Sequence, residues 1–100
     1  MSDYADLVGQ DIRLQLLRLL AQDSDYAVND TVLGQGLRLL GHDLSNDRVR
    51  AELGWLEEVG LVTVQPVGPY RVAQLTQRGL DVAQGRARVE GVRRPGPGEL

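Results

Sequence analysis

The stretch that most constrains the fold runs from Leu44 to Val62 and reads LSNDRVRAELGWLEEVGLV. Ser45 is a good N-cap, because its hydroxyl can accept a hydrogen bond from a free amide of the first helical turn. Apolar residues then recur on one stripe at helical spacing, at Val49, Leu53 and Leu56. Gly60 can end a helix in a left-handed conformation, and the β-branched run after it indicates a strand. The segment therefore predicts a helix that turns tightly into a strand.

Two helices are expected before this segment. The first spans Asp6–Ala21, where apolar residues lie on two sides of the helix, so both sides require burial. Asn29 or Asp30 can cap the second helix, which has a core-facing apolar stripe and ends at Gly41. The short stretch Tyr26–Val28 between them is compatible with a very short strand.

A hairpin and a fourth helix are expected after the central segment. Leu61–Val64 is β-branched and Tyr70–Leu75 returns as a second strand, with the Pro-rich and Gly-rich stretch QPVGP as the turn. Thr76 can cap a short helix from Gln77 to Gln84. We therefore expect an α+β fold.

The length of 100 residues fits one domain. Residues 86–100, RARVEGVRRPGPGEL, show no periodicity and contain two Pro-Gly dipeptides. Such a composition is typical of chain ends that bury little surface. We expect a folded domain over residues 1–85, followed by an extended or disordered C-terminal arm over residues 86–100.

This order of elements resembles the winged helix-turn-helix domain, with a three-helix core, a β-hairpin wing and a short fourth helix. The resemblance covers residues 6–85 and rests on WLEEVGLV at the helix-to-strand junction, VGPY in the wing and LTQRG at its exit. Over the whole length, the chain is similar to short repressor-like winged-helix proteins of Mu-like bacteriophages and prophages. The resemblance implies a sequence-specific DNA-binding regulator of transcription, with the third helix in the major groove.

In that docking mode, the first turns of the third helix lie nearest the bases. Arg50 would contact a guanine edge, and Asn46 an adenine or a phosphate. Alternatively, Arg50 is a solvated residue paired with Glu57 or Glu58. The residues expected to contact double-stranded DNA are Ser45, Asn46, Arg48, Arg50, Arg71, Arg86 and Arg88.

The charge of this surface favours a different partner. Asp47 and Glu58 lie opposite the core stripe, the wing offers only Arg71, and the net charge of the chain is −3. Ala51 and Gly54 are two small residues on the same exposed face, as close approach of another surface would require. The alternative function is a protein-interaction adaptor in phage assembly or DNA packaging that binds no DNA itself.

The second apolar stripe of the first helix contains Leu7, Leu14 and Leu17. It can pack inside one chain or form a two-fold seam between chains, and we favour a homodimer because symmetric dimers are the commonest oligomers. Trp55, at the edge of the core stripe, is expected to be partly buried against the hairpin or the first helix.

Enzyme chemistry finds little support in the sequence. No Cys and a single His exclude a structural zinc site of the usual kind, and we expect no cofactor. His42, with Ser45 three residues away in a turn, lacks an orienting carboxylate or an oxyanion-hole motif, so we expect no enzymatic activity. The acidic start of the chain lacks a signal peptide, and the apolar runs are too short to cross a bilayer, so we expect a cytoplasmic protein without membrane contact.

Overall fold

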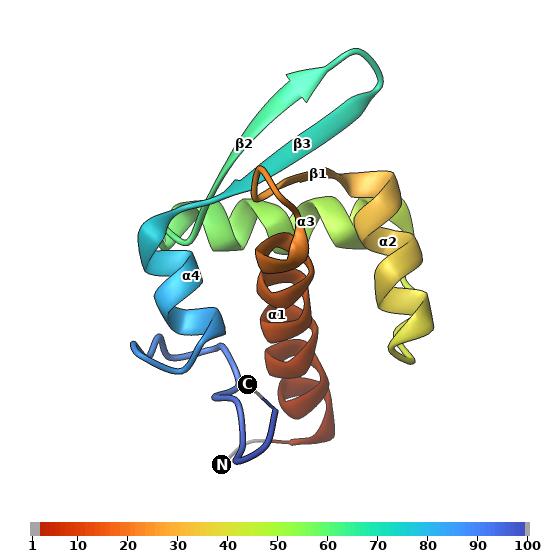
Figure 1. Ribbon diagram of the computed structural model, residues 1–100. Coiled ribbons are helices and arrows are strands. Elements are labelled where there is room, and N and C mark those ends of the chain that lie inside the picture. Colours follow the sequence, from red (N-terminus) through yellow and green to blue (C-terminus); the bar gives the residue numbers. More distant parts are fainter. Residues whose placement is uncertain (1–2, 100) are drawn as a thin grey trace.

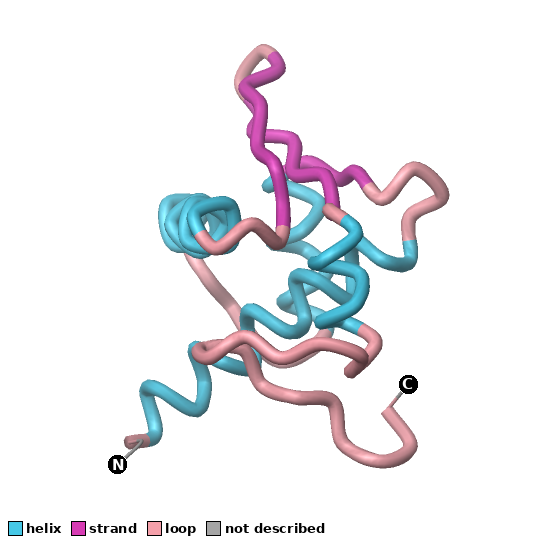
Figure 2. The backbone as a smooth tube through the Cα atoms, turned by 90° about the vertical axis from the view of Figure 1, so that its left-hand side faces the viewer, coloured by secondary structure: helices cyan, strands magenta, loops and turns pink. Residues whose placement is uncertain are grey.

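The computed structural model describes residues 3–99, in which four helices pack beneath a three-stranded antiparallel sheet (Figure 1). The elements in chain order are α1 (Tyr4–Gln22), β1 (Ala27–Asn29), α2 (Asp30–Leu39), α3 (Asn46–Glu58), β2 (Val62–Val67), β3 (Tyr70–Leu75) and α4 (Gln77–Ala83). The hairpin of β2 and β3 projects away from the helices (Figure 2). This α+β arrangement is compatible with the small winged-helix domain expected from the sequence.

Side-chain caps set the starts of all four helices, and Asp3 caps α1 by accepting the Asp6 amide. Asn29 accepts a hydrogen bond from the Val32 amide at the start of α2. Ser45 and Thr76 make the equivalent bonds at the starts of α3 and α4. Because these side chains satisfy amides that have no partner inside the helix, they fix where each helix begins. The caps predicted from the sequence are confirmed.

The sheet has the order β1-β3-β2, so β2 is an edge strand. The hairpin turn is shorter than predicted, because β2 continues through Pro66 and Val67 pairs with Tyr70. Pro66 fits there because an edge strand can leave one side without amide donors. Only Gly68 and Pro69 form the turn, and Gly68 adopts a φ of +58°, as glycine at the first position of a tight hairpin turn can do.

The core surrounds α1, which packs against both α2 and α4 (Figure 1). Leu14 and Leu17 are both 0% exposed within the single chain. The prediction that they form a seam between two chains is therefore wrong, because they have no surface left to offer a partner. Leu7, the third residue of that stripe, is 56% exposed. Within residues 3–99, no helix combines the length and apolar character needed to cross a membrane.

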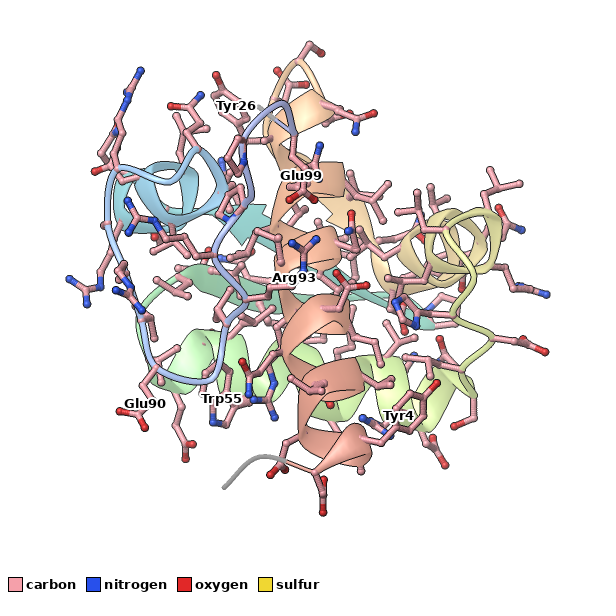
Figure 3. The ribbon with its side chains drawn as sticks, turned by 90° about the horizontal axis from the view of Figure 1, so that it is seen from below. Tyr4, Tyr26, Trp55, Glu90, Arg93 and Glu99 are labelled. Atoms are coloured by element: carbon pink, nitrogen blue, oxygen red, sulfur yellow. The ribbon has the colours of Figure 1, made fainter. Side chains whose placement is uncertain are left out.

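The segment after α4, Gln84–Glu99, has no helix or strand, yet it lies against α1 (Figure 3). The Arg93 amide donates to the carbonyl of Gln10 at 3.1 Å, and Val92 is buried. The Arg93 side chain donates to Asp11 at 2.8 Å and to both carboxylate oxygens of Glu99, at 3.0 and 2.8 Å. The expected C-terminal arm therefore packs against α1 through hydrogen bonds and the buried Val92. The domain boundary at residue 85 stays a prediction.

Acid is expected to loosen this segment. The hydrogen bonds from Arg93 are the main reason that the pKa of Glu99 falls from 4.5 to about 2. A carboxyl group whose pKa falls on folding stabilises the fold only while ionised. Its contribution is complete above about pH 4.5 and is lost as the pH falls toward 2.

Trp55 is the single Trp of the chain, so its fluorescence can be assigned without ambiguity. Gly91 of the C-terminal segment packs on its ring so closely that a Cβ at Gly91 would lie 2.9 Å from it. The fluorescence of Trp55 therefore reports whether the segment stays in place. We expect Glu99→Gln to raise acrylamide quenching of Trp55 fluorescence already at pH 7. Glu90→Gln, at an exposed position of the same segment, is the control and should not change it. Equal quenching of Glu99→Gln and the wild type at pH 7 would contradict a role for Glu99 in holding the segment.

Candidate macromolecular interface

The helix expected to contact a partner, α3, has one buried and one exposed face. Its buried residues are Val49, Glu52, Leu53 and Leu56. The exposed residues along the opposite side include Asp47, Ala51, Gly54 and Glu58. The helical spacing therefore predicted the buried stripe and most of the exposed face, but Arg50, expected on the exposed face, is half-buried.

Asp30, at the start of α2, is 0% exposed and accepts hydrogen bonds from two of the predicted DNA contacts. Nε of Arg50 donates to its carboxylate at 2.5 Å, and Nδ2 of Asn46 donates to the same oxygen at 3.2 Å. The main-chain amide of Arg71 donates to the other oxygen at 3.1 Å. Asp30 thus joins α2, α3 and β3 at one buried point.

The ionised form of Asp30 is favoured despite its burial. Burial raises the pKa of Asp30, but hydrogen bonds from Arg50, the Arg71 amide and Asn46 together lower it by more. The net pKa of Asp30 therefore lies below its ordinary value of 3.8. Arg50 also donates to the Pro69 carbonyl at 2.7 Å, which ties α3 to the hairpin turn. The alternative pairing of Arg50 with Glu57 or Glu58 is wrong, because its carboxylate partner comes from α2.

A second buried carboxylate, Glu52, forms an ion pair with Arg48. Nε of Arg48 donates to Glu52 at 2.9 Å, and Nε of Arg13 donates to its other oxygen at 2.8 Å. The Arg13 guanidinium also lies 4.1 Å from the centre of the Trp55 ring and donates to the Gly91 carbonyl at 3.0 Å. This cation–π contact confirms the expected partial burial of Trp55 against the first helix.

The exposed surface left on α3 is acidic, and the hairpin beside it is nearly uncharged. Asp47 and Glu58 face solvent, and the exposed Glu57 accepts the Val64 amide of β2 at 2.9 Å. The hairpin exposes Val67 (54%) and Tyr70 (43%) and has Arg71 as its one charged residue.

The structure does not gather the predicted basic residues into one patch. The side chains of Arg71, Arg86 and Arg88 make no ion pair within residues 3–99. The segment that follows α4, which contains Arg86 and Arg88, lies on the side of the molecule away from α2 (Figure 1). Ser45 caps α3, and its expected contact with DNA stays a prediction.

His42 has a carboxylate partner that its sequence neighbourhood did not reveal. Its Nε2 lies 2.7 Å from Oδ2 of Asp11, which is 31 positions earlier on α1. Burial raises the pKa of Asp11, but hydrogen bonds from His42 and Arg93 bring it below its ordinary value. The Ser45 hydroxyl is used as a helix cap, and no nucleophilic side chain of residues 3–99 hydrogen-bonds His42. The pair therefore links α1 to the loop before α3.

Two similar proteins come from a bacteriophage and a bacterium. The chain is 46% identical over 92 residues to a protein of Escherichia phage Mu described as "Uncharacterized protein gp26", covering 92% of this chain and 95% of that protein. It is 45% identical over 78 residues to an uncharacterized protein of Haemophilus influenzae, covering 77% of this chain and 76% of that one. No protein-family model matches the sequence. The two descriptions state no activity, so they convey relationship alone.

Proposed function

The chain belongs to the family of the phage Mu protein gp26, and we propose that it is a winged-helix adaptor whose third helix docks on another protein. One observation carries the proposal. The exposed face of α3 is acidic, and the basic side chains expected to read DNA are held by the buried carboxylates of Asp30 and Glu52.

The energies of the competing contacts favour this proposal. For Arg50 to reach a base, it must leave Asp30, whose carboxylate would stay buried without its charged partner. Breaking a buried ion pair in this way costs about 3–5 kcal/mol. A bidentate contact to guanine contributes about 1–3 kcal/mol of discrimination. Phosphates near Asp47 and Glu58 would add repulsion, so docking of α3 in a major groove is unfavourable.

The same surface suits a protein partner. Gly54 has nothing within 4 Å of the position a Cβ would take, so the backbone of α3 is open to close approach at this point. Ala51 lies beside it on the exposed face. Val67 and Tyr70 on the hairpin supply apolar and aromatic area of the kind enriched in interface cores. We expect a partner that packs closely on Ala51 and Gly54 and has basic groups around that contact.

A second candidate is the sequence-specific DNA-binding regulator, with α3 in the major groove. It is supported by the compatibility of the fold with a winged helix and by the side chain of Arg71, which makes no ion pair within the described residues. Arg86 and Arg88 would then contribute nonspecific phosphate contacts, and the protein would regulate transcription of phage genes.

Fluorescence anisotropy with a labelled random-sequence duplex, titrated from low to physiological salt, separates the two functions. We expect no binding by the folded protein even at low salt, because α3 offers phosphates no unpaired guanidinium, and Arg71, Arg86 and Arg88 do not form one basic patch beside it. Binding that weakens with a log–log slope of several would mean that several phosphates are neutralised and would overturn the adaptor proposal. Under DNA binding, Arg71→Ala would reduce that slope by about 1.

Site-specific crosslinking tests the adaptor directly. A photoreactive residue placed at Ala51 and expressed in the cells that naturally make the protein should crosslink to one protein species. The same residue at Arg78, an exposed position on α4, is the matched control and should not. Crosslinks at Ala51 to DNA, or to no macromolecule, would contradict the proposal.

A further inference from the structure

The solvent side of α2 and its C-cap residue Leu40 carry large apolar side chains that no part of residues 3–99 covers. Leu39 is 90% exposed, Val32 is 49% exposed and Leu40 is 48% exposed. This helix lies at the edge of the molecule beside α1 (Figure 1). A leucine that stays this exposed contributes no hydrophobic free energy to folding of the single chain. It can contribute only when a second molecule buries it.

A groove of about 380 Å³ runs between α2 and the end of α1, next to Leu39. Its apolar lining consists of Leu19, Val28, Val32, Leu33, Gly36 and Leu39. Gly36 keeps the groove open on one side, because a Cβ there would lie 2.9 Å from the Leu19 side chain. The protruding side chain and the hollow are therefore parts of one continuous surface.

We propose that a second copy of the chain occupies this groove in a two-fold dimer. Leu39 of each copy enters the groove of the other, near Val32. A two-fold contact brings one surface against itself, so it requires a protrusion and a matching hollow on the same patch. Because Val32 lies near the start of α2 and Leu39 at its end, the two copies of α2 run antiparallel in this arrangement.

Charged residues in and beside the groove also fit this arrangement. Arg38 precedes Leu39, its side chain is 58% exposed, and its ion pair is a distant one with Asp43 at 4.0 Å. Asp23 is an acidic residue that lines the groove. Oδ2 of Asp23 accepts the amides of Asp25 and Ala27, which leaves Oδ1 available. The dimer places Arg38 beside Asp23 of the partner subunit, twice by symmetry.

The dimer surface is separate from the adaptor surface. None of the groove residues belongs to α3 or to the hairpin. The inference therefore does not depend on the proposed function, and a dimer would present two copies of α3 to a partner.

Sedimentation equilibrium of the full chain at micromolar concentrations tests the dimer. We expect twice the 11.0 kDa mass of one chain. Leu39→Asp should raise the dimer Kd by at least about a hundredfold, because each dimer loses two buried leucines and gains two carboxylates in apolar grooves. The circular dichroism spectrum should not change, since Leu39 is exposed in the single chain.

Leu7→Asp is the matched control. Leu7 is exposed on α1 but does not line the groove, so this variant should stay dimeric. A wild-type protein that is monomeric at these concentrations would overturn the inference. A dimer that survives Leu39→Asp, or that Leu7→Asp dissociates, would also overturn it and would place the contact elsewhere.

Discussion

Replacing Gly79 with alanine is expected to lower the free energy of unfolding by about 3 kcal/mol or more, at the upper end of what overpacking costs. An alanine Cβ would lie 2.0 Å from the Leu61 carbonyl oxygen and 2.7 Å from the Leu75 side chain. The Leu61 oxygen cannot withdraw freely, because it accepts the Thr76 amide at 3.1 Å and the Thr76 hydroxyl at 3.0 Å. The first turn of α4 must therefore move away from β2.

Thermal unfolding followed by circular dichroism measures this effect. A domain of this size loses roughly 4–8 °C in Tm per kcal/mol, so we expect a fall of more than about 12 °C. Gly54→Ala is the matched control in another helix, since nothing lies within 4 Å of its Cβ position. It should raise the stability by up to about 1 kcal/mol through helix propensity. An unchanged Tm for Gly79→Ala would mean that α4 does not approach Leu61 this closely in solution.

The local features of the fold were predictable because they depend on neighbours in the sequence. The caps at Asn29, Ser45 and Thr76 act on amides only three residues later, and the apolar spacing of α3 gives its buried face. The sequence identified Gly79 as part of the LTQRG motif. The reason for a glycine there appears only in the structure, where the Leu61 carbonyl oxygen leaves no room for a Cβ. Burial of both sides of α1 was also predictable, although the pattern could not say whether the same chain or a partner covers the second side.

The candidate interface was not predictable at the level of its contacts. The partners of its polar groups are distant in sequence: Arg50 finds Asp30 20 positions away, and Glu52 binds Arg13 39 positions away. A helical wheel gives the side on which Arg50 lies but not the carboxylate that it meets there. The aperiodic sequence after α4 likewise gave no sign that Arg93 would bind α1, because single ion pairs leave no repeating pattern.

Replacing Asp30 with asparagine is expected to cost about 3 kcal/mol, the lower end of the range for breaking a buried ion pair. The amide keeps an acceptor for the Arg71 amide, but it brings an NH₂ group toward the donors of Arg50 and Asn46. Urea unfolding at pH 7 measures the loss. Asp25→Asn, which changes an exposed carboxylate nearby, is the control and should stay within about 0.5 kcal/mol of the wild type.

The pH dependence of the Asp30→Asn effect identifies its cause. The pKa of Asp30 lies below 3.8 in the folded chain, so its ionised form stabilises the wild type above that pH and less as the pH falls. The difference between Asp30→Asn and the wild type should therefore narrow in acid, and a pH-independent difference would contradict an ionic origin. Replacing Arg50 with methionine as well should recover part of the loss, because neither charge is then left without its partner. Asp30→Asn also releases Arg50 from its internal carboxylate, so a gain in duplex affinity by this variant would indicate that α3 can read DNA once Arg50 is free.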